Sequence, residues 1–279
     1  MQITFPFEKF FEKTKQNLSS GLPLHPAFSS DAPWARKLLH ALYQPYKWLV
    51  FVPFLLLSTL VFFLLALGTV ILFGPKTCSA IFPPLWSRLN SAVIPMRVKV
   101  SGAEHIDPAQ SYVVASNHGS LLDIFVLYGW LDMDIKWVMK TELRKVPIIG
   151  YICEKMDHIY IDRSDSRAAV ASINQAKHKI TNGTSVIFFP EGTRSADGKL
   201  GKFKKGAFRL AVDLNLPILP VTISGTRDIL PKGSLDLFPG TVQMTIHPPI
   251  RVWAGERHIE PLMEKTRTVI LAGLAEADN

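Results

Sequence analysis

The chain reads SVIFFPEGTRS at residues 185–195, where a short apolar run leads directly into a polar loop. The run Ser185–Phe189 has the length and the apolar, aromatic composition of a buried strand. In the loop, Gly192 allows the backbone to turn tightly, and Arg194 can hold a phosphate in a bidentate fork. The stretch therefore predicts a strand that ends at an anion-binding loop, although an exposed polar turn is the alternative for the loop taken by itself.

The same texture of short apolar runs and amphipathic segments extends over residues 96–279. The runs with strand character are Arg97–Ser101, Tyr112–Ala115, Lys136–Met139, Ile159–Asp162, Ser185–Phe189, Ile218–Ile223 and Val242–His247. The segments with helical periodicity are Leu121–Trp130, Arg167–Thr181, Gly206–Leu214 and Ile259–Ala275. Strands that alternate with helices favour an α/β domain, so we predict a mostly parallel or mixed β-sheet flanked by helices.

An uncharged apolar segment, Trp48–Phe73, precedes this domain. Its length of about 25 residues is enough to cross a hydrocarbon core of roughly 30 Å. The segment is apolar on every face, whereas the core helix of a soluble protein has one apolar stripe. Basic residues flank both of its ends almost equally, so a single span and a hairpin that re-enters the membrane both remain open. Kinks or breaks in and after the segment are expected at Pro53, Gly68, Pro75, Pro83 and Pro84.

We therefore expect three parts: an N-terminal extension at 1–33, a membrane-anchoring helical region at 34–95 and the α/β domain at 96–279. The formal net charge of +8 favours anionic partners, such as anionic membrane lipids or phosphorylated substrates. Nucleic acid is not an expected partner, because it would require a basic face interleaved with aromatic residues rather than a membrane anchor. The spacing of the two cysteines, Cys78 and Cys153, fits neither a zinc site nor a disulfide framework.

A second motif, NHGSLLD at residues 117–123, lies where a predicted strand ends and a helix begins. On one continuous helix His118 and Asp123 would point about 140° apart, so they can meet only if His118 lies in the loop before the helix. With Ser120 as the helix N-cap, Asp123 would then orient the imidazole and make His118 a general base toward a hydroxyl. The alternative is a capping box, in which Ser120 and Asp123 only begin the helix, and the two interpretations are compatible.

Cationic residues near these motifs are further candidates for an anion site. Lys140 and Arg163 each follow a predicted strand, and a basic cluster follows the SVIFFPEGTRS stretch at Lys199, Lys202, Lys204, Lys205 and Arg209. The chain contains no Walker phosphate loop, no dinucleotide glycine fingerprint, no His-Glu-x-x-His zinc pair and no Gly-x-Ser-x-Gly elbow. These absences weaken nucleotide-dependent, zinc-dependent and serine-hydrolase chemistry.

Together, the two motifs resemble those of the glycerolipid acyltransferases, in particular the 1-acyl-glycerol-3-phosphate acyltransferases. The family block Asn-His-x-Ser-x-x-Asp matches at Asn117, His118, Ser120 and Asp123, and Phe-Pro-Glu-Gly-Thr-Arg-Ser matches at every position of 189–195. The resemblance runs from about Arg97 to Pro249 and includes a strand that ends in arginine, matched at Arg163. It departs where the family often has glycine ahead of that strand, because this chain has Asp157 and His158 there.

The resemblance implies a set of roles. His118 would deprotonate the acceptor hydroxyl with Asp123 orienting it, and the hydroxyl would attack the thioester of acyl-CoA or acyl-carrier protein without a covalent acyl-enzyme. The acceptor's phosphate would be bound by Glu191, Gly192, Thr193 and Arg194, with Arg163 and Lys140 as weaker candidates. The family uses no metal for the chemistry, and no cofactor is expected beyond the thioester co-substrate.

The expected reaction is acyl transfer to the sn-2 hydroxyl of lysophosphatidic acid, a lysophospholipid, which gives phosphatidic acid in phospholipid biosynthesis. The alternatives are the same chemistry on glycerol-3-phosphate, another lysophospholipid or an aminolipid, and a non-catalytic lipid-binding protein on the same fold. Because the acceptor is a lipid, the enzyme is expected at a membrane with its active site facing the cytoplasm, the inner membrane if the source is bacterial.

Overall fold

The computed structural model describes residues 41–94, 96–146, 149–161, 179–180, 182–195, 197–233, 237–253 and 258–277. Its strands are β1 (Met96–Ser101), β2 (Val113–Ser116), β3 (Ile135–Lys140), β4 (Ile159–Ile161), β5 (Ser185–Phe188), β6 (Ile218–Ser224) and β7 (Gly240–Ile246). Its α-helices are α3 (Val52–Val93), α4 (Leu122–Trp130), α5 (Ile149–Lys155), α7 (Gly206–Leu214), α8 (Thr226–Ile229) and α9 (Glu260–Ala277). Short turns of other helix types are η2 (Lys47–Phe51), η3 (Ala103–His105) and η4 (Thr141–Lys145).

The strands form one sheet of seven in the order β1-β7-β6-β2-β5-β3-β4. Strands β6, β2, β5, β3 and β4 are parallel to one another. Strand β7 pairs antiparallel with β6, and β1 is parallel to β7. The predicted α/β class with a mostly parallel, mixed sheet is therefore confirmed. All seven predicted strand segments are strands, with ends shifted by one or two residues.

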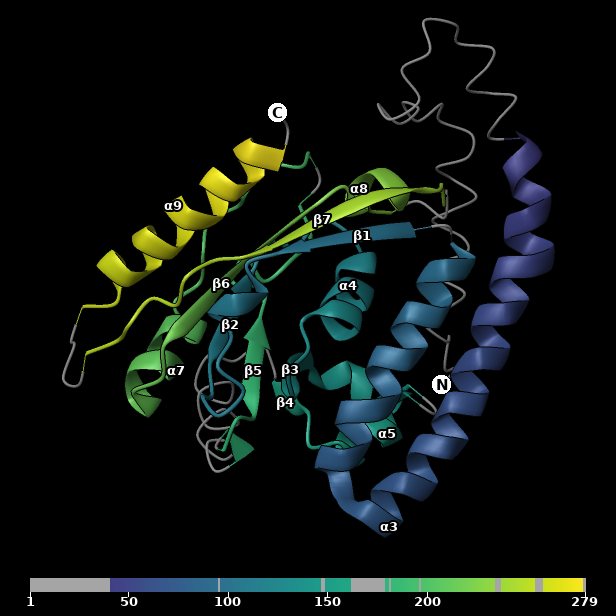
Figure 1. Cartoon of the computed structure of the whole chain (residues 1–279), viewed down its shortest axis with the longest axis horizontal. Helices are drawn as coiled ribbons and strands as arrows, with labels where there is room; N and C mark the ends of the chain where they lie inside the picture. Colours follow the sequence, from purple (N-terminus) through teal and green to yellow (C-terminus); the bar gives the residue numbers. More distant parts are fainter. Residues whose placement is uncertain are drawn as a thin grey trace, which may run out of the picture.

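Helices cover both faces of the sheet (Figure 1), as the alternation of side chains along the buried strands requires. Along β2, Val114 belongs to the core on the α4 side, whereas Val113 and Ala115 pack with α7 and α9 residues such as Phe208 and Leu262. The predicted helix Arg167–Thr181 lies outside the described residues apart from 179–180. Helices α5 and α8 were not predicted.

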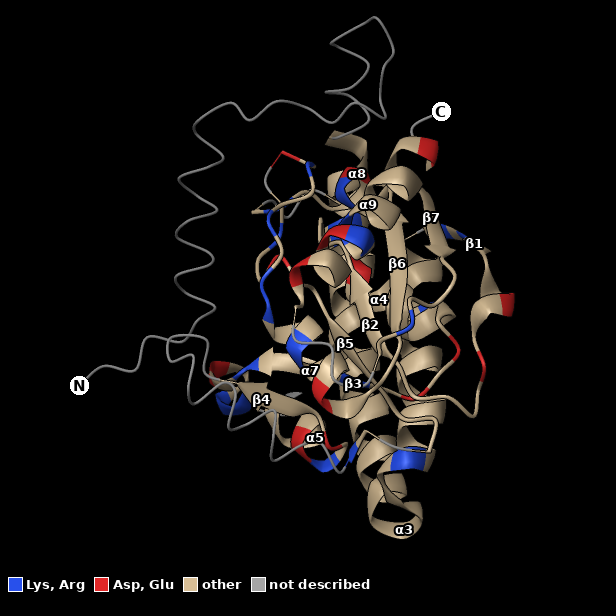
Figure 2. Ribbon diagram, turned by 90° about the vertical axis from the view of Figure 1, so that its left-hand side faces the viewer, with Lys and Arg blue, Asp and Glu red and all other residues tan. Residues whose placement is uncertain are grey.

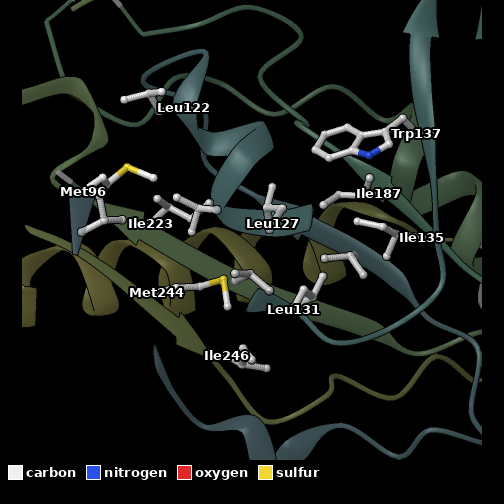
Figure 3. Close-up of a cluster of buried hydrophobic side chains, with 14 of the residues drawn as sticks. Met96, Leu122, Leu127, Leu131, Ile135, Trp137, Ile187, Ile223, Met244 and Ile246 are labelled. Atoms are coloured by element: carbon white, nitrogen blue, oxygen red, sulfur yellow. The ribbon is translucent and has the colours of Figure 1, made fainter. Parts of the chain in front are cut away.

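Figure 3 shows the core between α4 and the sheet. Leu122 and Leu127 of α4 lie over Ile187 of β5, Ile223 of β6 and Met244 of β7, and each of the five is at most 2% exposed. Burying a leucine or isoleucine side chain is worth roughly 1.5–3 kcal/mol. This layer therefore fixes the start of α4, and with it the loop that joins β2 to α4.

The long helix α3 is a hairpin of two helices, because Gly74 inside it has non-helical backbone angles (φ 82°, ψ 171°). The two halves contact each other along their lengths. Ser58 donates its hydroxyl to Asn90 at 3.1 Å, and Trp86 donates its indole N–H to Thr59 at 3.2 Å. Figure 1 shows the two halves side by side, antiparallel. Of the two open alternatives for the apolar segment, the structure thus has the hairpin geometry.

Three of the expected backbone breaks are wrong, those at Gly68, Pro83 and Pro84. Gly68 lies in regular helix, and the chain turns at Gly74, directly before the break expected at Pro75, where only glycine adopts the backbone angles without strain. Pro83 and Pro84 lie inside the second half without ending it. A proline removes one helical hydrogen bond, and here packing offsets that loss. Trp86, directly after the prolines, stacks on Phe125 of α4 with ring centroids 4.7 Å apart.

The hairpin is apolar on the side away from the sheet. Large exposed side chains come from both halves, among them Leu56, Leu60, Leu64, Phe73, Ile81 and Leu85. In Figure 2 the charges lie over the α/β part of the molecule, and the sequence of α3 carries only two charged residues, Lys76 and Arg88. By length and composition, Ala41–Val93 is one helical region that could cross a membrane, which on its own is weak support for a membrane protein.

Candidate active site

The two sequence motifs follow neighbouring strands of the sheet. NHGSLLD begins directly after β2, and the polar part of SVIFFPEGTRS begins directly after β5, which pairs with β2 in parallel. Parallel strands end at the same edge, which is where ligands bind in α/β sheets. A backbone hydrogen bond joins the two loops there, because the N–H of Ser195 donates to the carbonyl oxygen of His118 at 2.8 Å.

The predicted pair His118 and Asp123 is in contact. The Nδ1 atom of His118 lies 2.8 Å from Oδ2 of Asp123, and His118 lies in the loop before α4, as the sequence required. A carboxylate can only accept hydrogen bonds, so Nδ1 carries the proton and Nε2 keeps its lone pair. The imidazole is therefore held in the tautomer that a general base needs.

Asp123 is fully buried and accepts hydrogen bonds from four donors. Oδ2 accepts the N–H of Gly119 at 2.8 Å and of Ser120 at 3.0 Å, as well as the imidazole. Oδ1 accepts the hydroxyl of Thr226 at 2.5 Å. The helix N-cap is Leu121, one residue after the expected Ser120, yet Asp123 still reaches back to the amide of Ser120. The carboxylate that contacts the imidazole thus also holds the amide of the residue before the N-cap.

The imidazole of His118 is held on its face as well as at its edge. Its ring is stacked on that of Phe189, with centroids 3.8 Å apart and planes at 8°. The side chain of His118 is 14% exposed, so one edge remains accessible to a reactant. The loop beneath it is anchored by Asn117, whose side-chain amide exchanges two hydrogen bonds with the backbone of Ile223 on β6, at 2.7 and 2.8 Å.

Glu191 is a link between loops. One carboxylate oxygen accepts the N–H of His118 at 2.9 Å, and the other accepts the N–H of Gly201 at 2.8 Å. Burial raises the pKa of Glu191, and these two hydrogen bonds lower it in part. Both oxygens are thus directed at backbone amides of the chain.

Gly192 and Thr193 form the turn that follows. Gly192 has φ 72°, and a Cβ placed on it would lie 2.8 Å from Cε of Lys204, so the lysine side chain crosses directly over this turn. Thr193 is exposed. A tight glycine turn covered by an ammonium group suits the close approach of an anion.

The guanidinium of Arg194 is half-buried at the same edge. Burial lowers its pKa, and the negative charge of Asp123 raises it, which indicates that the two groups are close enough to interact. Among the described residues, no carboxylate forms an ion pair with Arg194. The backbone carbonyl of Arg194 accepts a hydrogen bond from the ammonium of Lys232.

Of the two other predicted phosphate ligands, the structure describes Lys140 but not Arg163. Lys140 is the last residue of β3, at the same edge of the sheet, and its side chain is exposed. Arg163 lies outside the described residues. Ahead of it, where the resembled family often has glycine, Asp157 adopts φ 63°. The backbone conformation that favours glycine is therefore present at a non-glycine residue.

Sequence reasoning missed Thr226 and Arg227 of α8. Thr226 is 103 positions from its partner Asp123, and no motif marks it. Arg227 passes over Gly119 and Gly198: added Cβ atoms on these glycines would lie 3.7 Å from its Cβ and 2.8 Å from its Nη1. Within the described part of the chain, no group of three or more His, Cys, Asp or Glu residues could hold a metal ion.

Residues 97–224 match the Acyltransferase family. A chloroplastic 1-acyl-sn-glycerol-3-phosphate acyltransferase of Brassica napus is 37% identical over 169 residues, which is 60% of this chain and 48% of the relative. The human 1-acyl-sn-glycerol-3-phosphate acyltransferase alpha is 36% identical over 156 residues, 56% of this chain and 55% of the relative. The chain spans about half the length of the curated relatives it matches.

One solved structure is similar over most of its length. The 1-acyl-sn-glycerophosphate acyltransferase of Thermotoga maritima superimposes with a TM-score of 0.64 at 29% sequence identity. The match covers 80% of this chain and 95% of the other. The likeness therefore includes parts of the chain outside the residues that match the family.

Proposed function

We propose that this chain, whose residues 97–224 match the Acyltransferase family, transfers a fatty acyl group from a thioester to the sn-2 hydroxyl of lysophosphatidic acid, giving phosphatidic acid. One observation carries the proposal. An imidazole held by a buried carboxylate, His118 on Asp123, lies in a loop tied by its backbone to the loop of Arg194. A base and a cation are thus joined at one edge of the sheet.

In the proposed reaction, Nε2 of His118 accepts the proton of the acceptor hydroxyl as its oxygen attacks the thioester carbonyl carbon. A C–O bond forms, the C–S bond breaks, and the proton passes from the imidazolium to the departing thiolate. Asp123 stabilises the imidazolium while the charge is present. The steps balance without an acyl-enzyme, a metal or a cofactor beyond the acyl-CoA or acyl-carrier protein that donates the acyl group.

Arg194 would bind the phosphate of the acceptor, because its guanidinium forms no ion pair with a carboxylate among the described residues. The charge of Asp123 raises the pKa of Arg194, so the guanidinium is close to the pair proposed as the base. Gly192 and Thr193 would give the phosphate room at the turn beside it. We assign Glu191 a positioning role, since its carboxylate is used by two backbone amides. Lys140 and Arg163 remain additional candidates for the same anion.

The apolar hairpin would hold the site at a lipid surface. It belongs to the membrane-anchoring part at 34–95, which precedes the α/β domain at 96–279. A hairpin returns to the side it entered from, so both flanking basic regions would contact the anionic lipids of one leaflet, the cytoplasmic one in our proposal. The acceptor and product, both lipids, would then not have to leave the membrane surface.

The test offers purified protein radiolabelled acyl-CoA or acyl-carrier protein with a panel of acceptors. These are lysophosphatidic acid, glycerol-3-phosphate, another lysophospholipid and an aminolipid. We expect turnover with lysophosphatidic acid that His118→Ala abolishes. The control is His105→Ala, which removes an imidazole bonded to the carbonyl of Ile246, away from the site. Preference for another acceptor would show that the substrate is not lysophosphatidic acid but would leave the proposed chemistry intact. A folded His118→Ala protein that stays active would overturn the general-base role.

A further inference from the structure

The two oxygens of the Asp123 carboxylate accept different numbers of hydrogen bonds. Oδ2 accepts three hydrogen bonds, all from its own motif: those of His118, Gly119 and Ser120. Oδ1 accepts one, from Thr226, which is remote in sequence and lies on α8. Among the described residues, Thr226 is thus the one donor that holds Oδ1.

Resting on the function proposed above, we propose that Thr226 is a positioning residue of the reaction, which fixes the Asp123 carboxylate so that Oδ2 faces Nδ1 of His118. A carboxylate rotates about one bond, and a donor on each oxygen stops that rotation. Since Asp123 acts on the reactants only through the imidazole, Thr226 acts through two residues and touches neither substrate.

The hydroxyl of Thr226 is itself held in place. Thr226 is 2% exposed and begins α8, directly after Gly225. Gly225 has φ 85°, and a Cβ on it would lie 2.3 Å from the carbonyl oxygen of Thr241, so the entry into α8 is fixed by close backbone packing. At the other end of α8, the carbonyl of Leu230 accepts the hydroxyl of Ser120 at 2.7 Å. Two ties therefore align α8 with the motif that carries His118.

The alternative is that this hydrogen bond only joins α8 to α4 and supports the fold. The two roles differ in what they change. A positioning role lowers kcat and leaves the Michaelis constants of both substrates alone, because the binding groups do not move. A role in folding alone lowers stability without affecting the turnover of the folded molecules.

The experiment compares Thr226→Val, which removes the hydroxyl and keeps the shape, with Thr226→Ser, which keeps the hydroxyl. The matched control is Thr222→Val on β6, which removes a buried hydroxyl bonded to Nε2 of His247 at 2.8 Å. We expect Thr226→Val to lose about tenfold in kcat with both Michaelis constants within about twofold. Thr226→Ser and Thr222→Val should retain the wild-type kcat. Unchanged kcat in Thr226→Val, or an equal loss in Thr222→Val, would overturn the proposal.

A double variant tests whether Thr226 acts through Asp123. If Thr226 acts through Asp123, Thr226→Val should cause no further loss of kcat in an Asp123→Asn background, and independent, multiplying losses would refute this. Should Thr226→Val fail to fold, Thr226→Cys replaces the hydroxyl with a weaker donor of similar size, and we expect an intermediate kcat from it. A wild-type kcat in Thr226→Cys would then count against the proposal.

A spectroscopic readout separates this inference from the proposed function. In protein labelled with ¹⁵N-histidine, the Nδ1–H proton of His118, assigned by its loss in His118→Gln, should give a downfield resonance. We expect it in the wild type and in Thr226→Ser, and shifted upfield or broadened in Thr226→Val. If the three proteins give these resonances but the wild type acylates none of the acceptors, the proposed function fails and the positioning role stands. If the resonance is the same in all three proteins, the positioning role fails whatever the activity.

Discussion

The carboxylate of Glu191 accepts the backbone N–H of His118 at 2.9 Å, across 73 positions of sequence. Its second oxygen accepts the N–H of Gly201, which lies in the same β5–α7 connection as Glu191, so one side chain joins two loops at the edge of the sheet. The loop that carries Arg194 thereby positions the backbone of the residue proposed as the base.

We predict that Glu191→Gln lowers kcat by about 10- to 100-fold, because a hydrogen bond to a charged group is worth roughly 1.5–3 kcal/mol. The amide has one acceptor oxygen, and its NH₂ would face a backbone N–H. Steady-state kinetics with lysophosphatidic acid measures the effect. Glu154→Gln is the control, since Glu154 is exposed and forms an ion pair with Arg144 at the surface. If Glu191→Gln has the same kcat as that control, Glu191 does not position the residues of the site.

How far the site could be predicted depends on sequence distance. His118 and Asp123 are five positions apart, so the geometry of one loop and one helix start was enough to bring them together. The link from Thr226 to Asp123 crosses 103 positions and depends on α8, a helix of four residues that no periodicity reveals. Contacts that depend on the order of the strands in the sheet can be predicted only once that order is known.

The same limit applies to the hairpin. The seven strands were predictable because buried strands carry runs of apolar, β-branched residues between turn residues. In the apolar segment, Gly74 turns and Gly68 stays helical; Gly74 precedes Pro75, which disfavours helix at the residue before it, so the break itself was predictable to within one position. The contacts between the two halves, such as that of the Phe62 ring with the Phe82 ring, are marked by no motif in the sequence.

Those two glycines give a matched pair of substitutions. A Cβ would meet nothing within 4 Å at either position, so only the backbone conformation differs. Gly74→Ala should destabilise the fold by roughly 1–3 kcal/mol, because alanine is strained at φ 82°. Gly68→Ala should stabilise it by up to about 1 kcal/mol, through helix propensity. Thermal unfolding in detergent measures both, and shifts of the same sign would contradict the turn at Gly74.

His158 should make stability depend on pH. Burial lowers its pKa from 6.5 to about 3, and the charges of Lys136 and Lys179 add to this. Its Nδ1 accepts the N–H of Trp137 at 3.3 Å, and Nε2 lies 2.8 Å from the hydroxyl of Tyr128, so the ring is held neutral. Because the folded state excludes a proton that the unfolded state binds, the contribution is present above pH 6.5 and is lost as pH falls toward 3.

Between these limits, each pH unit should remove up to about 1.4 kcal/mol of folding stability. The measurement is chemical unfolding between pH 7 and 4, on the wild type and His158→Gln. The variant should be less stable at pH 7 and lose less as the pH falls. Parallel pH profiles for the two proteins would show that His158 titrates as it does in the unfolded chain.

Arg194→Ala tests the anion site. Removing the guanidinium should raise the Michaelis constant of lysophosphatidic acid by about 10-fold or more, since a charge-assisted hydrogen bond is worth roughly 1.5–3 kcal/mol. The constant for the acyl thioester should change little, because in the proposed reaction the donor has no phosphate bound by Arg194 and reacts at His118. Arg251→Ala is the control, an exposed arginine outside the basic cluster that follows Ile250, which pairs with Ile218 at the opposite end of β6. Equal increases for acceptor and donor would show that Arg194 shapes the site as a whole and does not bind the phosphate.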